Sequence, residues 1–456
     1  MYQGHHHPLE VPHLHGSRCH HRAEAHVDAQ DVGDLETFAF EVVYLDHNAT
    51  TPVRPEVVEA MARAAVDCPG NPSSVHAWGR RARDAVERAR AQVAAFVGVS
   101  REEIVFTSGG TEGDNLAIRG LAVGARARGR RHIITSPIEH PAVLGAVSAL
   151  VAEVTDAPPP RVTLLPVSAR GEVALADLEA ALCDDTALVT LSLANHELGN
   201  RYPIGRFAAA ARGRGALVHT DAVQAAGKIP LDLTELGVDA ATISAHKMGG
   251  PKGVGAVFIR RGLDLPPLLA GGHQERERRP GTENVAGIVG FGVACDLARA
   301  ALAGTGSTCT AERMEALRRD LLGTLTAIPG TRILGFGDGV DGSLPDAVAE
   351  QRISGTVMVA FSGAPGQLVA IGLDLDGVCV STGAACTSGS LEPSPVLRAL
   401  GLGIDEASEG VRISLGWTTT AADIRRLGEV LPGIVARVRA AVTAPATIGH
   451  AQGGRS

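Results

Sequence analysis

Residues 103–115 read EIVFTSGGTEGDN, and this stretch decides the fold class. Its first half is a short apolar run rich in β-branched residues, which is typical of a buried strand. Gly109 and Gly110 then form a turn, and the polar run from Thr111 has the composition of a helix start. The stretch therefore predicts a strand that leads directly into a helix, which is the repeating unit of α/β proteins.

The same unit recurs on both sides of this stretch. Helical patterns rich in Ala, Arg and Glu, such as RRARDAVERARAQVAAFVG, separate further short apolar runs. The runs that we predict as strands are EIVFTS, RHIITS, RVTLLPV, ALVTLSLA, ALVHTD, AATISA and GAVFIRR. Strands that alternate with helices pair mostly in parallel and are buried on both faces. We therefore expect an α/β fold with a mostly parallel, buried sheet.

Chain length and a change of pattern indicate two domains. The chain has 456 residues, whereas single hydrophobic cores seldom grow beyond about 250 residues. In the last third of the chain, a long Ala/Leu/Arg helical pattern leads into the apolar runs SGTVMVAFSG and GVCVSTG. We assign residues 58–300 to a large α/β domain, and residues 42–57 together with 301–445 to a smaller α+β domain. Residues 446–456 are expected to form a disordered tail.

Residues 1–41 have a different character. They contain eight histidines and show neither a helical nor a strand period. A tract of this composition can bind metal ions. We favour a disordered extension, an upstream start or a cloning remnant, and we assign no metal site.

Composition restricts the partners and the compartment. The formal net charge of −8 and the pI near 6.1 argue against a broadly basic surface for nucleic acid. The seven cysteines are odd in number and form no CxxC pair, so neither a disulfide framework nor a zinc site is expected. We find no signal-peptide run and no stretch of about 18 uninterrupted apolar residues. We therefore expect a cytoplasmic protein with no nucleic-acid or membrane partner.

Polar residues at the strand ends indicate the chemistry, because ligands of parallel α/β sheets bind beyond the carboxyl ends of the strands. The helix start at Gly110 and Thr111 presents free backbone N–H groups and the positive end of a helix, which suit a phosphate. Taken alone, this start is more often simple turn and cap chemistry, and it lacks the P-loop spacing.

A second strand end, in ALVHTDAVQAAG, places Asp221 at the turn and Gln224 three residues later. A lone aspartate at this position usually caps the turn. Beside a phosphate site and a strand-end lysine, however, a carboxylate can pair with the protonated ring nitrogen of a cofactor and keep that ring an electron sink. The combination indicates pyridoxal 5'-phosphate.

A third strand end, ISAHKMGGPKG, offers two lysines. Lys247 directly follows the predicted strand AATISA, with Ser244 and His246 beside it as further phosphate donors. Lys252 follows Gly-Gly-Pro in a turn, where a lysine is ordinarily a solvated charge. We therefore predict that Lys247, and not Lys252, is the Schiff-base lysine.

These stretches belong to a longer series that resembles the cysteine desulfurases. The series follows that family's order over roughly residues 43 to 440 and comprises YLDHNATTP, GNPSSVHAWG, IVFTSGGTEGDNLAI, HIITSPIEHPAV, HTDAVQAAGK, ISAHKMGGPKGVGAVFIRRG, RRPGTENVAGIVGFG and GAACTSGSLEPSPVLRALG. The resemblance implies a fold-type-I pyridoxal-phosphate-dependent transferase that forms a homodimer. The segment GAACTSGS resembles the subgroup with a long cysteine loop, which serves iron–sulfur cluster assembly and general sulfur delivery.

The resemblance also implies roles for individual residues. Lys247 would carry the cofactor, Asp221 would pair with its ring nitrogen, and Gln224 would face its ring oxygen. His140 would stack on the ring and assist proton transfer, although as an isolated residue it would be a loop or cap histidine. The residues implied to hold the phosphate and neighbouring cofactor groups are Gly110, Thr111, Ser244, Ala245, His246 and, from the other subunit, Thr282. The residues implied to bind the substrate are Arg412, for its carboxylate, and Asn195.

Cys386 is the implied sulfur acceptor. Its neighbours are glycine, alanine, threonine and serine, which is the composition of a loop, and only a thiolate attacks well. Cys379, in the apolar run DGVCVST, is expected to be buried and inert. One departure from the family pattern concerns its usual Asn-Asn-Glu, which is replaced here by Asn195, His196 and Glu197. We expect His196 to contact the cofactor and to alter efficiency and substrate preference, because its size and titration differ from those of asparagine.

The predicted reaction converts L-cysteine to L-alanine and leaves a sulfur atom on Cys386, which an acceptor protein then receives. A selenocysteine lyase, or another lyase or aminotransferase of the same fold, is the first alternative. Cys386 distinguishes it from a desulfurase, because these reactions need no sulfur-accepting thiol. A catalytically weak scaffold that binds a sulfur-transfer partner is the second alternative, and His196 is its only support in the sequence.

Overall fold

The computed structural model describes residues 42–153, 158–263, 265–305, 311–336, 351–383 and 392–443. The predictions for the histidine-rich tract, for the terminal tail and for Cys386 lie outside the described residues. Val42 begins a compact unit that contains every described element. The division of this unit into a large and a small domain stays a prediction.

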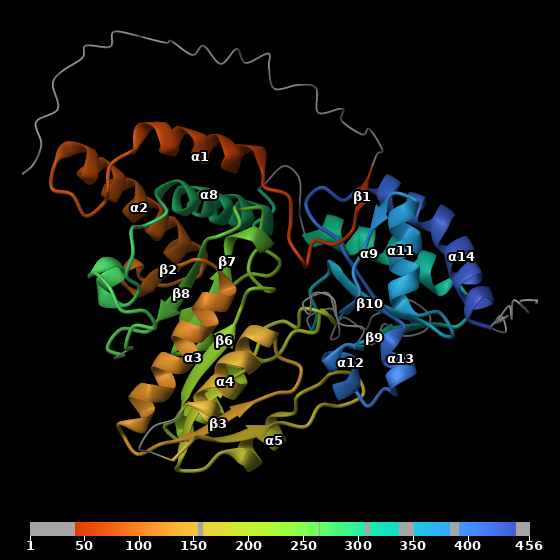
Figure 1. Cartoon of the computed structure of the whole chain (residues 1–456), viewed down its shortest axis with the longest axis horizontal. Helices are drawn as coiled ribbons and strands as arrows, with labels where there is room; N and C mark the ends of the chain where they lie inside the picture. Colours follow the sequence, from red (N-terminus) through yellow and green to blue (C-terminus); the bar gives the residue numbers. More distant parts are fainter. Residues whose placement is uncertain are drawn as a thin grey trace, which may run out of the picture. The chain divides into compact units, whose positions relative to one another are not determined.

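A seven-stranded sheet forms the centre of the larger part of the fold (Figure 1). Its strands are β2 (Ile104–Thr107), β3 (His132–Thr135), β4 (Arg161–Leu164), β5 (Thr186–Thr190), β6 (Leu217–Asp221), β7 (Ala240–Ser244) and β8 (Gly255–Ile259). The spatial order is β2-β8-β7-β6-β5-β3-β4. The strands β3 to β7 pair in parallel, whereas β8 runs antiparallel to both β7 and β2. Each of these strands coincides with one of the predicted apolar runs, except that β5 begins one residue before its run, so the prediction of a mostly parallel α/β sheet is confirmed.

Successive side chains on each inner strand enter two different hydrophobic cores. On β3, Ile133 packs into one core and Ile134 into the other, and Val257 and Phe258 of β8 divide in the same way. This is the two-residue period of a strand that is covered on both faces. The edge strand β4 differs, because its burial is partial or absent along its length. This strand is the exception to the expectation that most of the strands are buried, whereas the other edge strand, β2, is buried along its whole length.

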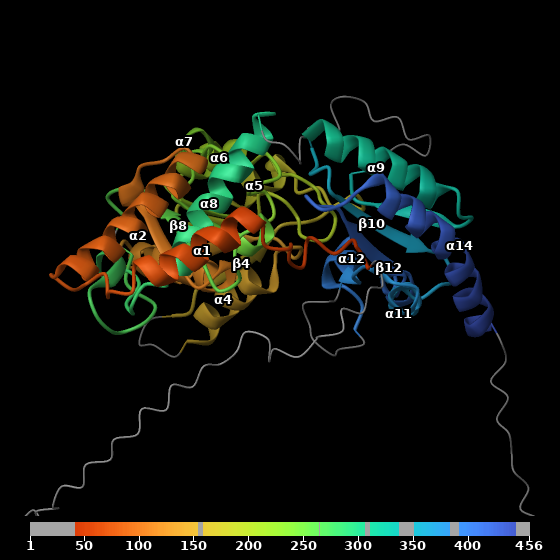
Figure 2. The same cartoon turned by 90° about the horizontal axis from the view of Figure 1, so that it is seen from above.

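Helices cover both faces of this sheet. On one face lie α3 (Gly110–Arg126) and α4 (Pro141–Ala152), which pack against each other (Figure 1). The helices toward the other face include α2, α6 and α8, which Figure 2 shows on the side opposite to α4. The remaining elements of this part are α1 (Pro55–Asp67), α2 (Ala77–Phe96), α5 (Leu175–Ala181), α6 (Ile204–Gly213), α7 (Leu233–Leu236), α8 (Val285–Leu302) and the 3₁₀ turns η1 (Arg101–Glu103), η2 (Ala245–Lys247) and η3 (Gln274–Glu277).

Among the described helices, α8 alone is long and apolar enough to cross a membrane by length and composition. It carries Asp296 and Arg299, and it packs against α1 and α2. Half of its most apolar window is buried inside the protein. These contacts are those of a core helix.

A second, antiparallel sheet has the order β12-β10-β9. Its strands and the elements around it are β9 (Thr331–Leu334), β10 (Thr356–Phe361), β12 (Gly410–Ser414), α9 (Ala311–Thr326), α11 (Gly366–Leu375), α12 (Pro395–Ala399), α13 (Ile404–Ser408) and α14 (Ala421–Thr443). Val357 and Val359 of β10 pack into the core of this sheet, whereas Met358 between them joins the core of the larger part. A short strand β1 (Val43–Tyr44) pairs in parallel with β11 (Val378–Cys379), which brings the segment after β1 alongside the second sheet.

Candidate active site

A cavity of about 230 Å³ opens at the carboxyl ends of the parallel strands. The residues that line it come from strand ends and from the helices that follow them; they are Gly110, Thr111, Asp114, His140, Ser192, Ala194, His196, Asp221, Val223, Gln224, Ser244, His246 and Lys247. Nine residues of this lining are predicted site residues. The sequence prediction of a common site at the strand ends therefore agrees with the geometry, although the role of each residue stays a prediction.

One part of the cavity suits an anion. Helix α3 begins at Gly110, and the backbone N–H groups of a first helical turn have no partner within the helix. The Ser244 hydroxyl lies nearby and is a buried polar atom without a partner among the described residues. A Cβ added at Gly110 would come within 3.0 Å of Val223, so the absence of a side chain keeps this approach open. An orphaned buried hydroxyl beside a helix N-terminus is a good site for a phosphate.

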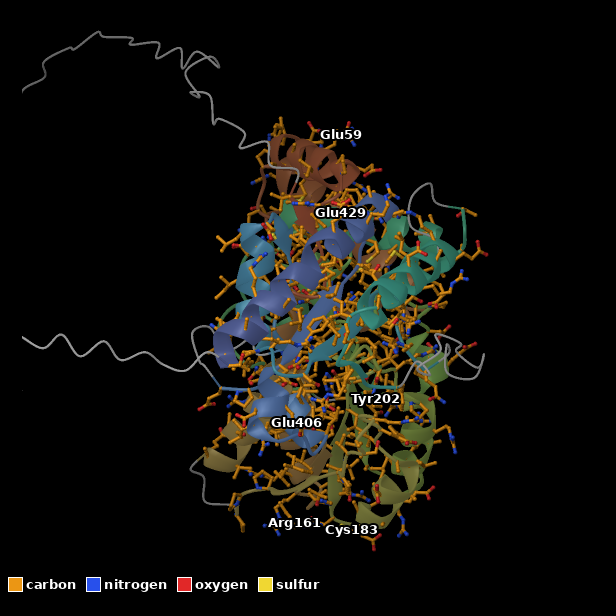
Figure 3. The ribbon with its side chains drawn as sticks, turned by 90° about the vertical axis from the view of Figure 1, so that its right-hand side faces the viewer. Glu59, Arg161, Cys183, Tyr202, Glu406 and Glu429 are labelled. Carbon is orange, nitrogen blue, oxygen red and sulfur yellow. The ribbon has the colours of Figure 1, made fainter. Side chains whose placement is uncertain are left out.

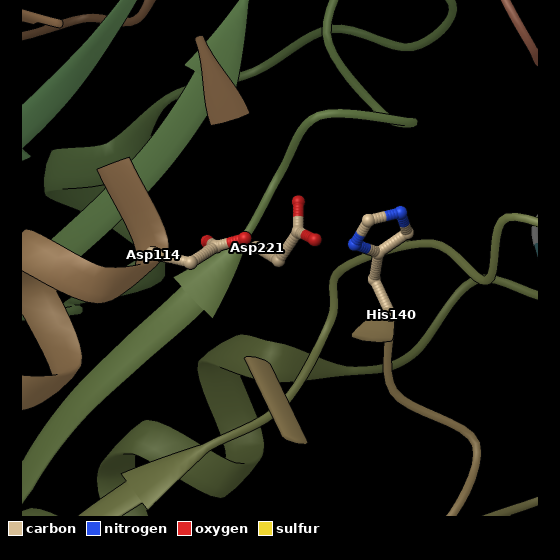
Figure 4. A group of neighbouring side chains, drawn as sticks. All are labelled: Asp114, His140 and Asp221. Atoms are coloured by element: carbon tan, nitrogen blue, oxygen red, sulfur yellow. The ribbon is translucent and has the colours of Figure 1, made fainter. Parts of the chain in front are cut away.

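Another part of the cavity suits a cation. Asp221, at the end of β6, lies beside Asp114 of α3 and His140, and one potential ligand atom from each lies within 4.8 Å of those of the other two (Figure 4). Burial raises the pKa of Asp221, and the pKa of Asp114 rises well above its usual range through burial and through the neighbouring Asp221 charge. A positive group would relieve this repulsion, whether a protonated ring nitrogen or a metal ion.

His140 has two roles in the geometry. Its Nδ1 accepts a hydrogen bond from the backbone N–H of Ala142 at 3.1 Å and so caps α4. Burial lowers the pKa of His140, and the neutral ring then carries its proton on Nε2, because Nδ1 is the acceptor. His140 therefore caps a helix, as expected of an isolated histidine, and also lines the cavity predicted to hold the cofactor.

His196 packs edge-on against this ring. The two ring centroids are 5.2 Å apart with an angle of 77° between the planes. His196 Nε2 also lies 3.6 Å from a carboxylate oxygen of Glu197, and burial lowers the pKa of His196 well below its usual range. The departure from the family pattern thus places a second, neutral imidazole in the cavity wall.

Lys247 ends the turn η2, directly after β7. Its amine donates to the backbone carbonyls of Asn48 at 2.5 Å and of Ala49 at 2.8 Å. Lys252 is exposed and lines neither this cavity nor the smaller one beside it. The preference for Lys247 over Lys252 rests on this placement.

The predicted substrate arginine lies behind the cavity wall. Arg412 of β12 is buried and donates to the Asp46 carboxylate at 2.9 Å and to the backbone carbonyl of His196 at 3.1 Å. Its Nε is buried without a partner among the described residues. The guanidinium therefore keeps one donor available, while its other contacts fix its place behind His196.

The second predicted substrate residue, Asn195, uses its side-chain amide on nearby backbone groups. Its Nδ2 donates to the carbonyl of Ile138 at 2.8 Å. Its Oδ1 accepts from the backbone N–H groups of Glu197 and Leu198, each at 2.9 Å. Substrate contact by the Asn195 side chain would require some of these bonds to open.

Two further predicted residues lie outside the lining. Ala245 is buried at the start of η2, where its carbonyl accepts from Met248 and Gly250. Thr282 is exposed in the loop after η3, so within one chain it does not reach the cavity. Its prediction depends on a second subunit and stays a prediction.

Sequence reasoning missed four lining residues, Asp114, Ser192, Ala194 and Val223, and two residues beside the cavity, Asn48 and Lys228. Asp114 stands in the opening stretch, three residues after Thr111 and therefore on the same face of α3, which was an available signal. Asn48 and Lys228 both lie within recognised motifs, YLDHNATTP and HTDAVQAAGK, but their contact joins positions 180 residues apart. No local pattern indicates a contact of that kind.

Comparison with known proteins identifies the family. The family model described as aminotransferase class-V matches residues 43–427. A protein named cysteine desulfurase from Trichormus azollae is 46% identical over 401 residues, which are 88% of this chain and 94% of that protein.

The chain belongs to the cysteine desulfurases. Among solved structures, one described as a NifS-like protein has a TM-score of 0.77 at 36% identity and covers 87% of this chain and 100% of its own. A second, SspA in complex with cysteine, has a TM-score of 0.67 at 32% identity and covers 83% of this chain and 99% of its own. These relatives confirm the resemblance and the fold-type-I class that the motifs predict. Class-V cysteine desulfurases generally depend on pyridoxal phosphate, and the anion site, the buried carboxylate and the lysine of this cavity fit that cofactor.

Proposed function

We propose that this cysteine desulfurase holds pyridoxal 5'-phosphate in the cavity, converts L-cysteine to L-alanine, and leaves the sulfur on Cys386 as a persulfide for an acceptor protein. The observation that carries the proposal is a single cavity that combines the unpartnered Ser244 hydroxyl at a helix N-terminus, the buried Asp221 carboxylate and the Lys247 amine. A phosphate, a protonated ring nitrogen and an aldehyde carbon are the matching groups of the cofactor.

The residues that would hold the cofactor divide by the group they face. Asp221 would pair with the ring nitrogen, Gln224 would face the ring oxygen, and His140 would stack on the ring. The residues for the phosphate are Gly110, Thr111, Ser244, His246, the backbone at Ala245 and, in a homodimer, Thr282 of the partner subunit. When bound, the cofactor's pyridinium ring withdraws electrons from the substrate and makes its Cα–H bond acidic.

The chain's own residues then move protons and sulfur. Lys247, once free as an amine, takes the Cα proton, and the carbonyls of Asn48 and Ala49 give that amine a defined position. The substrate carboxylate requires a bidentate cation, and Arg412 is the guanidinium that contacts the His196 wall. His140 is neutral at physiological pH and supplies an N–H on the substrate side of the site.

Sulfur transfer belongs to Cys386. Its thiolate forms an S–S bond with the substrate sulfur while the substrate's C–S bond breaks, and the carbon that keeps that electron pair takes a proton and becomes the methyl group of alanine. A free thiol has a pKa of about 8.5, so a base must remove its proton before the attack. The persulfide then passes its outer sulfur to an acceptor. By the subgroup resemblance we propose iron–sulfur cluster assembly as the recipient pathway and the cytoplasm as the compartment.

The decisive experiment measures cofactor and sulfur separately. Protein loaded with pyridoxal phosphate should be yellow, form alanine from L-cysteine, and carry added sulfur on the peptide that contains Cys386 by mass spectrometry. Lys247→Ala should lose the colour and the turnover, whereas Lys252→Ala should keep both. Turnover that survives in Cys386→Ser would favour the plain lyase alternative, and a loaded protein that forms no alanine would favour the scaffold.

A further inference from the structure

The chain contains three lysines among its 42 lysine and arginine residues, and two of them reach the same residue. Lys247 donates to the backbone carbonyl of Asn48 at 2.5 Å, and Lys228 donates to the Asn48 side-chain Oδ1 at 2.6 Å. Lys228 lies at the end of the turn that follows β6, and no step of the proposed reaction uses it. Arginine supplies nearly all of the positive charge of this chain. One of its three lysines nevertheless lies at a partly buried position beside the active site.

Lys228 has a second acceptor in Gln224. Its amine donates to Gln224 Oε1 at 2.6 Å, and Gln224 lines the cavity where the cofactor would bind. A side-chain amide can rotate by about 180°, which exchanges the positions of its acceptor oxygen and its donor nitrogen and hardly changes its shape. Burial and the nearby charges of Lys247 and Arg412 lower the pKa of the Lys228 amine well below its usual range. Its charged form is a donor only, and its neutral form still has two N–H groups for the oxygens of Gln224 and Asn48, so the Gln224 oxygen faces Lys228 and the nitrogen points away from it.

This orientation directs the amide nitrogen of Gln224, which is a hydrogen-bond donor, away from Lys228. One of its N–H groups goes to the backbone carbonyl of Asn48 at 3.0 Å, and the nitrogen carries a second N–H. If the amide were reversed, its oxygen would lie against that carbonyl oxygen, and two acceptors would face each other. The contact with Lys228 and the contact with Asn48 therefore select the same orientation.

The same argument applies to the Asn48 side chain. Because Oδ1 accepts from Lys228, Nδ2 is the end that donates to the His196 carbonyl at 3.1 Å and to Thr356 Oγ1 at 2.9 Å. The His196 carbonyl also accepts from Arg412 at 3.1 Å. The orientation that Lys228 imposes therefore extends from the cofactor side of the cavity to the proposed substrate arginine.

We propose that Lys228 is a positioning residue, whose amine decides which end of the Gln224 and Asn48 side-chain amides faces the active site. The inference rests on the proposed function, because the cofactor's ring oxygen is the acceptor that needs an N–H from Gln224. Without Lys228, only the contact with the Asn48 carbonyl holds the Gln224 amide, so the amide presents its oxygen to that acceptor more often, which weakens cofactor binding.

The first experiment compares Lys228→Met with Lys252→Met, which removes the exposed turn lysine. Lys228→Met should raise the dissociation constant for pyridoxal 5'-phosphate about tenfold or more, since the hydrogen bond from Lys228 orients the binding group. It should also shift the pH midpoint of the visible cofactor band, because the ring oxygen loses its donor. Lys252→Met should leave both values unchanged. Wild-type values in Lys228→Met would overturn the inference and leave the proposed function intact, whereas wild-type protein that binds no pyridoxal phosphate would overturn the proposed function.

A double-mutant cycle tests whether Lys228 acts through Gln224. Gln224→Ala should weaken cofactor binding by itself, and adding Lys228→Met to it should weaken binding by less than about threefold more, because there is no amide left to orient. Independent effects that multiply in the double variant would contradict the positioning role. Should Lys228→Met fail to fold, Lys228→Arg carries the same test, since a guanidinium is also a donor only and the adjoining cavity of about 80 Å³ offers room for it. It should keep binding within about threefold of the wild type, and a loss of about tenfold or more would overturn the inference.

The cofactor-free chain gives a readout that does not depend on the cofactor. Each of the three lysines can be followed by mass spectrometry after treatment with acetic anhydride. Lys228 should be acetylated at least about tenfold more slowly than Lys252, because its amine is enclosed by two acceptors. Asn48→Ala removes the Oδ1 acceptor of Lys228 but keeps the backbone carbonyl that Lys247 contacts, so it should accelerate acetylation of Lys228 but not of Lys252. Equal rates at Lys228 and Lys252 in the wild type would show that the network does not exist in solution and would also overturn the inference.

Discussion

Asp114 on α3 and Asp221 at the end of β6 present two buried carboxyl groups to one side of the cavity, with ligand atoms within 4.8 Å of each other. Two such groups do not both ionise readily, because burial and mutual repulsion raise the pKa of the carboxyl group. The pKa of Asp114 rises well above its usual range, and only Asp221 has His140 and Lys247 among the charges that lower it. We therefore expect the pair to divide, with Asp114 as the carboxyl group that keeps its proton and Asp221 as the one that ionises.

This division predicts opposite results for two conservative substitutions. Asp114→Asn replaces a carboxyl that is already neutral, so alanine formation should stay within about threefold of the wild type. Asp221→Asn removes the charge that pairs with the ring nitrogen and should lower kcat/KM about 100-fold, the equivalent of about 3 kcal/mol. Steady-state kinetics with L-cysteine distinguish the two. Equal losses would mean that the two carboxyl groups share the charge.

The imidazole of His196 predicts a change in substrate binding. His196→Asn restores the usual family residue and removes the ring that packs on His140 at 5.2 Å. Because burial keeps His196 neutral, the substitution changes size and hydrogen bonding but not charge. We expect KM for L-cysteine to fall by about two- to tenfold, the range for one regained hydrogen bond, with kcat nearly unchanged. A drop in kcat with constant KM would instead assign His196 to proton transfer.

The Arg412 contacts predict a combined effect on binding and stability. Arg412→Ala removes the proposed partner of the substrate carboxylate and also leaves the Asp46 carboxylate without its guanidinium at 2.9 Å. Arg412 is buried but the Asp46 side chain is 18% exposed, so we expect a loss of roughly 1.5–3 kcal/mol of folding free energy, the range for a hydrogen bond to a charged group. Thermal unfolding should therefore shift together with the apparent affinity for L-cysteine, while cofactor absorbance is retained. Arg412→Ala with wild-type unfolding would show that the ion pair adds no stability.

The described cysteines should differ in reactivity. Cys183 lies beside Arg161 at one end of the molecule, with the guanidinium 3.2 Å from its sulfur, and a hydrogen bond from Thr186 is the largest cause that lowers the pKa of its thiol (Figure 3). Burial raises the pKa of Cys379 and, more strongly, that of Cys295. Iodoacetamide near neutral pH should therefore label Cys183 before Cys379 and leave Cys295 unmodified in the folded protein.

Cys183→Ser provides the control for the sulfur assignment. A reactive surface thiol can take up sulfur from solution. Each persulfide found by mass spectrometry must therefore be assigned to a particular cysteine. Cys183→Ser should keep full alanine formation. A loss of alanine formation in Cys183→Ser would show that Cys183 takes part in sulfur transfer.

Glu139 predicts a pH dependence of stability. Burial raises the pKa of Glu139 from its ordinary value of 4.5 to about 7, against the hydrogen bonds that Ser136 and Ser192 donate. A carboxyl group with a raised pKa in the folded state holds its proton while the unfolded chain releases it, so its contribution is present below pH 4.5 and is lost as the pH rises to about 7. The loss amounts to about 3 kcal/mol. Glu139→Gln should flatten the unfolding free energy between these pH values, and an unchanged slope would contradict the shift.

The sequence is most informative where local pattern and strand order coincide. The runs that form β3 and β5 to β8 are apolar, short and followed by turns, so both their existence and their burial are predictable. Residues at the ends of these strands share one edge of the sheet, which is why the amino-acid sequence alone predicts that Asp221, Ser244 and Lys247 lie together. The sequence also predicts that most of the strands pair in parallel, although it does not predict which strands are neighbours.

The remaining features depend on tertiary contacts that no local pattern reports. The antiparallel direction of β8 depends on the strand order, which the apolar runs do not encode, and no local pattern reports the exposed position of β4. The Asn195 side chain is expected on the substrate, but its amide is occupied by nearby backbone groups. Lys228 has no recognisable role in the sequence, because its partners Asn48 and Gln224 are brought together only by the fold.

The segment after β1 has a consequence for how the enzyme is made. The backbone N–H of Asn48 donates to Ser414 Oγ at 2.9 Å, and the N–H of Ser414 donates to the carbonyl of Leu45 at 2.8 Å. The residue that receives the Lys247 amine is therefore held by β12, one of the last elements that the ribosome synthesises. A nascent chain can complete its central sheet long before it can hold Asn48 in place. We therefore expect the Lys247 amine to reach its defined position late in biogenesis, because a chain terminated before Gly410 lacks the contacts that hold Asn48.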